Sequence, residues 1–197
     1  LAALRMLTEY YHGTKPSISL LTQSQQQGYT TDGEMFDIRN LMALGEDCCG
    51  LHLELVTPFP TVKAIQDALR HNSTLILPFD AHPATKQPCQ NAGRHAHYGI
   101  IVGLMQYDDG TTTNEQQVCR ESDFIVREHD DDGSVDNDPL VIVQHSLCQS
   151  LTIASYSRFA DSNRQLTPVD DSKFPKTSEP FLRNRVILCS GSRENHQ

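Results

Sequence analysis

Two neighbouring histidines and six cysteines give this 197-residue chain the residue types that nucleophilic catalysis needs. His95 and His97 lie directly before an apolar run at residues 98–105. A neutral imidazole next to a thiol acts as a general base, and the thiolate that forms attacks a carbonyl carbon. The pattern therefore predicts cysteine–histidine chemistry, provided that the fold brings a cysteine to one of these rings.

His97 is the better candidate base because it stands immediately before the apolar run. His95 lies two residues earlier, so in an extended chain it projects from the same face but further out. Two other interpretations remain open. His97 is equally well explained as a hydrogen-bonded polar residue at a strand edge. A metal site is the less favoured one, since His95 and His97 share a face and His82 and Cys89 lie upstream.

The cysteines present in the chain do not supply an obvious nucleophile. Cys89 follows a proline in a polar loop, with no helix start beside it. Cys49 lies at the end of a predicted helix, where the dipole disfavours a thiolate. Cys148 and Cys189 resemble buried core thiols. Their scattered spacing favours a reduced protein and provides no zinc motif.

The surrounding pattern predicts the elements that would position these residues. Tyr98, Ile100, Val102 and Leu104 alternate with other apolar residues and glycines, which is typical of a central strand covered on both faces. Helical periodicity and capping residues predict helices at 1–12, 37–44 and 61–72, and a short helical turn at 156–159. Further strands are predicted at 51–55, at 74–77 with Pro78 as its end, and at 140–143, 151–154 and 186–188. This order predicts an α+β domain over residues 1–197, with N-terminal helices packed on an antiparallel sheet.

Charge and hydropathy argue against a nucleic-acid-binding or membrane-spanning protein. Eleven Asp and Glu residues and only two Arg lie between positions 107 and 138, a balance that equals the whole net charge of −9. We interpret this segment as an acidic, mobile insertion, because it has little apolar surface to bury. The rest of the chain has no basic stripe for nucleic acid and no apolar run long enough to cross a membrane. No cofactor or metal is expected.

Several short motifs together resemble the actin maturation protease family, a group of papain-like cysteine peptidases. Gly33-Glu34-Met35-Phe36 is similar to that family's helix-start motif. Its long signature is matched by Leu77-Pro78-Phe79-Asp80, Pro88-Cys89, Gly93 and Ala96-His97-Tyr98, and its C-terminal block by Gln144, Asp161-Ser162-Asn163 and Gln165-Leu166. The resemblance implies a papain-like fold and a cytoplasmic thiol protease, a hydrolase of the aminopeptidase type that removes the acetylated N-terminal residue of actin. It also implies the actin N-terminus as partner, with profilin as the candidate to present it.

The same resemblance places the catalytic residues. His97 falls in the position of the base, and the family's nucleophile precedes a Gly-Leu-x-Ala-Leu motif that Leu1-Ala2-Ala3-Leu4 continues. We therefore expect a Cys-Gly pair immediately upstream of Leu1, and expect the chain as given to be inactive. Relatives carry Asp where this chain has Ser155, so Ser155 and, further along, Asp161 are the candidates to orient the imidazole. The alternative is a catalytically inactive actin-binding module of the same fold.

Overall fold

A mixed assembly of five helices and one antiparallel sheet makes up the described part of the chain. The computed structural model describes residues 1–197 except 17–18, 31, 107–137, 149, 168–181 and 191–197. Almost all of the acidic segment at 107–138, including its apolar patch at 124–126, therefore lies outside the described residues. None of the described helices has the length and apolar character needed to cross a bilayer.

The elements follow the predicted order, with helices first and most strands later. The helices are α1 (Ala2–His12), α2 (Leu20–Gln26), α3 (Ile38–Cys49), α4 (Val62–Arg70) and α5 (Tyr156–Arg164). The strands are β1 (His52–Val56), β2 (Ser73–Ala81), β3 (Pro88–Cys89), β4 (Ala96–Met105), β5 (Leu140–Gln144), β6 (Thr152–Ser155) and β7 (Val186–Ser190). The α+β layout expected from the sequence is thus confirmed, although α3 and α5 are longer than predicted.

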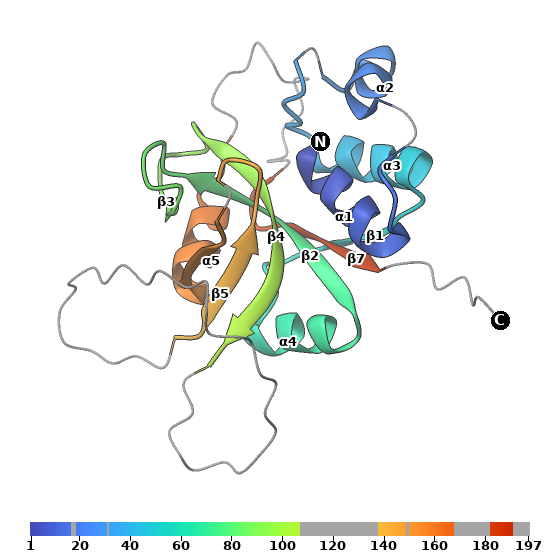
Figure 1. Cartoon of the computed structure of the whole chain (residues 1–197). Coiled ribbons are helices and arrows are strands. Elements are labelled where there is room, and N and C mark those ends of the chain that lie inside the picture. The colour runs from blue at the N-terminus through green and yellow to red at the C-terminus, as the bar shows by residue number, and fades with distance from the viewer. Residues whose placement is uncertain (17–18, 31, 107–137, 149, 168–181, 191–197) are drawn as a thin grey trace.

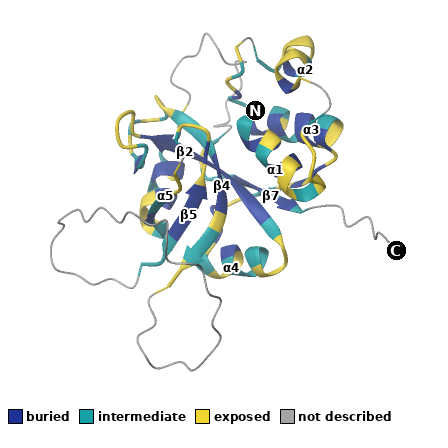
Figure 2. Ribbon diagram, viewed as in Figure 1, coloured by how far each residue is buried: buried dark blue, intermediate teal, exposed yellow. Residues whose placement is uncertain are grey.

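The sheet is flanked by helices on both faces (Figure 1). Its strands run in the order β1-β7-β2-β4-β5-β6, with β3 paired to β2 at one end. One core cluster joins α1 and α3 to the face of Ile76 and Ile100, and a second joins α4 and α5 to the face of Leu77 and Phe79. Figure 2 shows these buried residues running along the central strands, while the helices expose their outer sides.

Capping residues set where the helices begin and end. The side chains of Asp37 and Thr61 accept backbone N–H bonds at the starts of α3 and α4, as their sequence positions predict. Gly13 ends α1 in the left-handed conformation, with φ at 67°, which is the predicted C-terminal cap. The sequence rules for helix ends therefore hold at these three positions.

The prediction that Pro78 ends its strand is wrong, because β2 continues through it to Ala81. In a strand, the nitrogen and carbonyl of one residue point to the same side. The carbonyl of Pro78 accepts a 2.8 Å hydrogen bond from Asn163 Nδ2 on α5, so its nitrogen also faces a side without a strand partner. β7 pairs with β2 only up to Ile76, and the pairing of β3 with β2 begins only at Asp80. Proline has no N–H, but at this position no neighbouring strand would accept it, so the sheet loses no hydrogen bond.

The histidine-bearing strand, β4, is central as predicted, between β2 and β5. Its first half is tightly packed because Gly99 has no side chain. A Cβ at Gly99 would stand 2.4 Å from Val143 Cγ1 and 3.1 Å from Phe79 Cε1. This glycine lets β5 and the Phe79 ring close over β4 next to His97.

We expect Gly99→Ala to lower the free energy of unfolding by about 1–3 kcal/mol, the usual cost of overpacking a core. The added methyl group meets fully buried neighbours that have little room to shift. Urea denaturation monitored by circular dichroism measures the loss. Gly103→Ala is the matched control on the same strand, because its nearest neighbour is the flexible Cδ1 of Ile142 at 3.0 Å and its other contacts are ordinary ones at 3.5 Å. Equal losses in the two variants would contradict this account of Gly99.

Candidate active site

The start of β4 and the end of β5 meet at one end of the sheet, because the two strands are antiparallel. His97 is the second residue of β4, and His145 follows the last residue of β5. Their rings are in contact edge to face, with centroids 5.6 Å apart and planes at 73°. Two imidazoles, rather than the expected one, therefore form the centre of the candidate site.

His97 is half-buried, and one of its two ring nitrogens is engaged. Nε2 lies 3.3 Å from the hydroxyl oxygen of Ser146. Among the described residues, no hydrogen-bond partner reaches Nδ1. Burial lowers the pKa of His97 to about 4, and the nearby His145, the ammonium group of Leu1 and Lys86 act in the same direction. The ring is therefore neutral at physiological pH, with Nδ1 available to accept a proton.

His145 is held in one orientation by its own hydrogen bonds. It is only 2% exposed, and its Nδ1 accepts the backbone N–H of Leu147 at 3.3 Å. The ring proton therefore belongs on Nε2, which lies 2.9 Å from the Thr152 hydroxyl oxygen. Burial and Lys86 lower the pKa of His145 as well. A neutral, fixed His145 thus packs against His97 without competing for protons.

The first residue of the chain lies on the His97 side of the fold. Leu1 packs against the core cluster that includes Tyr98 and Ile100 of β4, so the N-terminus of α1 lies beside the strand that carries His97. Figure 1 shows the N-terminus at the end of the sheet where β4 begins. The positive end of a helix dipole favours an anionic group such as a thiolate at such a position.

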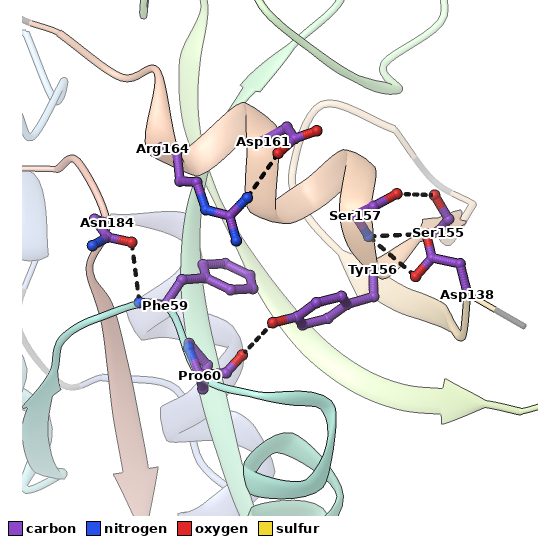
Figure 3. A network of polar contacts seen from close by, with 9 residues as sticks. All are labelled: Phe59, Pro60, Asp138, Ser155, Tyr156, Ser157, Asp161, Arg164 and Asn184. Carbon is purple, nitrogen blue, oxygen red and sulfur yellow. Dashed lines mark hydrogen bonds and ion pairs between the residues drawn. The ribbon is translucent and has the colours of Figure 1, made fainter. Parts of the chain in front are cut away.

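The structure does not bring the two predicted orienting residues to His97. Ser155 is the last residue of β6 and pairs with Leu140, at the opposite end of β5 from His145. Leu140 in turn pairs with Met105, at the far end of β4 from His97, a strand length of roughly 25 Å. The Ser155 hydroxyl instead lies 3.1 Å from that of Ser157 (Figure 3).

The carboxylate of Asp161 also lies away from His97. Asp161 projects from α5, and its carboxylate forms an exposed ion pair with Arg164 at 2.9 Å (Figure 3). The residue in contact with the free edge of the His97 ring is Ser146, which the motif comparison had passed over. The motif resemblance matched the end of β6 to the family's orienting position, whereas in the structure the loop after β5 reaches His97.

The described cysteines stand away from His97. Cys49 is buried, and burial raises the pKa of its thiol. Cys89 pairs opposite Asp80, and burial and that carboxylate raise its pKa too. Cys148 is nearest to the pair of rings, with Sγ 3.5 Å from His145 Nε2, but its thiol donates to the Ser150 carbonyl oxygen. Because His145 Nε2 already carries a proton, it does not act as a base toward Cys148.

The alternative of a metal site is not supported by the geometry. Within the described ranges, no three His, Cys, Asp or Glu side chains are placed to hold a metal ion. His82 uses Nδ1 to accept the backbone N–H groups of Ala84 and Thr85. His95 is exposed, whereas His97 is turned toward His145.

The lowered pKa of His97 predicts acid sensitivity. Between pH 6.5 and about 4 the unfolded chain binds a proton that the folded site excludes, so stability is complete above pH 6.5 and is lost as the pH falls. We expect His97→Gln to recover about 1–3 kcal/mol of the stability lost between pH 7 and pH 4.5, allowing for partial solvent screening. Urea unfolding at both pH values measures it.

His52→Gln provides the control for that measurement, because His52 is exposed on β1. It should keep the parental difference between pH 7 and pH 4.5. A His97→Gln variant with the parental pH dependence would mean that the folded site accommodates a charged imidazole.

The sequence analysis did not identify His145 and Ser146 as site residues. Their position just after a predicted strand could have indicated it. A predicted strand at 140–143 ends just before them, and an antiparallel neighbour of the histidine strand must end where that strand begins. A histidine two residues beyond such a strand therefore belongs beside His97. Only the pairing of these two strands, which the sequence leaves open, was needed to place it.

Comparisons with known proteins identify a family for the part of the chain that carries His97. The family model described as actin maturation protease-like, C-terminal domain, matches residues 1–105. Three proteins named actin maturation protease are similar: from Drosophila melanogaster, 32% identical over 111 residues; from Mus musculus, 30% over 105; and from Homo sapiens, 26% over 93. These matches cover 53%, 50% and 46% of this chain, and 39%, 29% and 26% of those proteins. The chain thus matches well under half of each relative's length, and no solved structure matches it.

Proposed function

Since the chain belongs to the actin maturation protease-like family, we propose that its protein is a cytoplasmic cysteine peptidase that removes the acetylated N-terminal residue of actin. The names of the relatives support a protease that acts in actin maturation. The observation that carries the chemistry is the position of His97, neutral and with Nδ1 available, on the strand that packs beside the start of α1.

The proposed nucleophile is a cysteine of the full-length protein just upstream of Leu1, at the N-terminus of α1. His97 takes the thiol proton on Nδ1, and the thiolate attacks the carbonyl carbon of the first peptide bond. His97 then returns the proton to the leaving amine, and water hydrolyses the thioester. This arrangement of a thiol at a helix start and an imidazole on a facing strand is that of papain-like peptidases.

We assign the orienting role to Ser146 instead of Ser155 or Asp161. Its hydroxyl contacts His97 Nε2, which leaves Nδ1 for the proposed thiol. A hydroxyl holds the ring but adds no negative charge to stabilise an imidazolium. The buried, neutral His145 supports the ring from the side.

The test uses the full-length protein and an acetylated peptide with the actin N-terminal sequence, followed by mass spectrometry. The expected result is release of the acetylated first residue, lost after alkylation of thiols with iodoacetamide. The same assay with actin, alone and bound to profilin, tests whether profilin presents the substrate. Binding of the peptide without cleavage would favour the inactive actin-binding module, an alternative suggested by the neutral Ser146 beside His97.

A further inference from the structure

A buried carboxylate lies just behind the candidate base and has no role in the chemistry described so far. Asp80, on β2, is 0% exposed. Its oxygens accept three backbone N–H bonds: from Asn91 and Gly93 at 2.9 Å each, and from His95 at 2.7 Å. A buried carboxylate is costly unless its oxygens find such donors. Here the donors all come from one loop.

That loop is the segment that leads into β4. The three donor residues alternate along the chain, and the last of them stands two residues before His97. Asp80 itself pairs with Ala96, and the N–H of Ala81 bonds the carbonyl of His95 at 3.1 Å. The backbone on the N-terminal side of His97 is therefore fixed at every second residue by a single side chain.

The C-terminal end of α5 closes the same network from the other side. Gln165 donates from Nε2 to Asp80 Oδ2 at 3.3 Å and accepts the backbone N–H of Ala92. The N–H of Asp80 bonds the hydroxyl of Ser162 at 2.9 Å. Gly93 allows the loop to lie this close to Thr167. Its φ is 82°, and a Cβ at this position would stand only 2.6 Å from the Thr167 carbonyl oxygen.

We propose that Asp80 is a positioning residue that sets the location of the His97 imidazole by ordering the loop at residues 91–95. Asp80, Ser162 and Gln165 all belong to the motifs that resemble the family, and this assignment gives them a role. It rests on the proposed function of His97. Asp80 touches no reacting atom, so it acts on the reaction only through the placement of His97. In catalysis a shift of about 1 Å in a base costs on the order of 10²-fold in rate.

The test combines a site measurement on the 197-residue chain with kinetics on the full-length protein. In Asp80→Asn the amide nitrogen cannot accept the N–H groups that its carboxylate oxygen accepted. We expect hydrogen exchange at the Asn91, Gly93 and His95 amides to accelerate at least about tenfold. We expect the pKa of His97, followed by NMR of its ring, to rise from about 4 toward 6.5 as water enters. In the full-length protein, kcat should fall about 10- to 100-fold with KM within threefold.

Asp47→Asn is the matched control, since it makes the same chemical change at an exposed position of α3. It should leave all three readouts at parental values. Gly93→Ala serves as the second variant if Asp80→Asn does not fold, because it keeps the carboxylate but forces the loop away from Thr167. It should shift the His97 pKa and kcat in the same direction.

The outcomes separate this inference from the proposed function. A folded Asp80→Asn or Gly93→Ala protein with the parental His97 pKa and kcat would overturn the positioning role, even if its thermal midpoint fell. If the parental full-length protein does not cleave the peptide, the proposed function fails. The exchange and pKa measurements on the 197-residue chain then still decide whether Asp80 places His97.

Discussion

In the full-length protein, His97→Ala is expected to lower kcat/KM for cleavage of an acetylated actin N-terminal peptide by about 10²-fold or more. The imidazole would serve twice, first as base for the thiol and then as acid for the leaving amine, and alanine supplies neither function. The His97 ring is bordered by His145 and Ser146, neither of which is free to replace it. Peptide cleavage measured by mass spectrometry gives the ratio, with circular dichroism to verify folding.

His95→Ala is the matched control for this experiment. His95 is exposed, and its hydrogen bonds to Asp80 and Ala81 are made by its backbone N–H and carbonyl, which alanine retains. Its activity should stay within about tenfold of the parent. If both variants lost activity and bound zinc together, a metal centre would be correct and the peptidase assignment would fall.

Phe79→Ala is expected to cost about 3–5 kcal/mol of unfolding free energy, the largest single loss that the described core predicts. The Phe79 side chain is 0% exposed and lies on the strand that pairs with His97. Its ring is 5.4 Å from that of Phe159 and 5.5 Å from that of His145, centroid to centroid. Removing the ring opens a cavity between the sheet, Phe159 and His145. Urea denaturation of the 197-residue chain measures the loss.

Truncation of a large apolar side chain at the surface provides the control. Met105, at the far end of β4, is 48% exposed, so Met105→Ala should change stability by less than about 0.5 kcal/mol. Phe79→Ala should also make the His145 ring mobile, which NMR detects as a broadened ring resonance. A Phe79→Ala cost below about 1 kcal/mol would mean that neighbouring side chains fill the cavity.

Local rules predicted most of the elements because the relevant signals are short-range. Gly13, Asp37 and Thr61 mark helix ends in the sequence, and the structure uses all three. The alternating apolar pattern after His97 identified the central strand, because a strand buried on both faces must have such a pattern. These inferences needed no knowledge of which elements become neighbours.

The remaining features depend on long-range pairing, which a single sequence does not display. Pro78 was expected to end a strand, but its tolerance depends on Asn163, 85 residues away, bonding its carbonyl. The contact between His97 and Ser146 depends on β4 and β5 being adjacent across a segment of more than 30 residues. The role of Asp80 was equally hidden, since its loop partners lie 11 to 15 residues further along the chain and Gln165 lies 85 residues away.

The position of β7 has a consequence for how the protein is made. This late strand lies between β1 and β2 and is the only described strand that pairs with β1. On the ribosome, β1 leaves the exit tunnel more than 100 residues before its hydrogen-bonding partner exists. The emerging chain therefore waits with an unpaired strand edge exposed, a state that invites aggregation and engagement by chaperones. Nascent chains halted before residue 186 should bind Hsp70-type chaperones more strongly than chains released after residue 190.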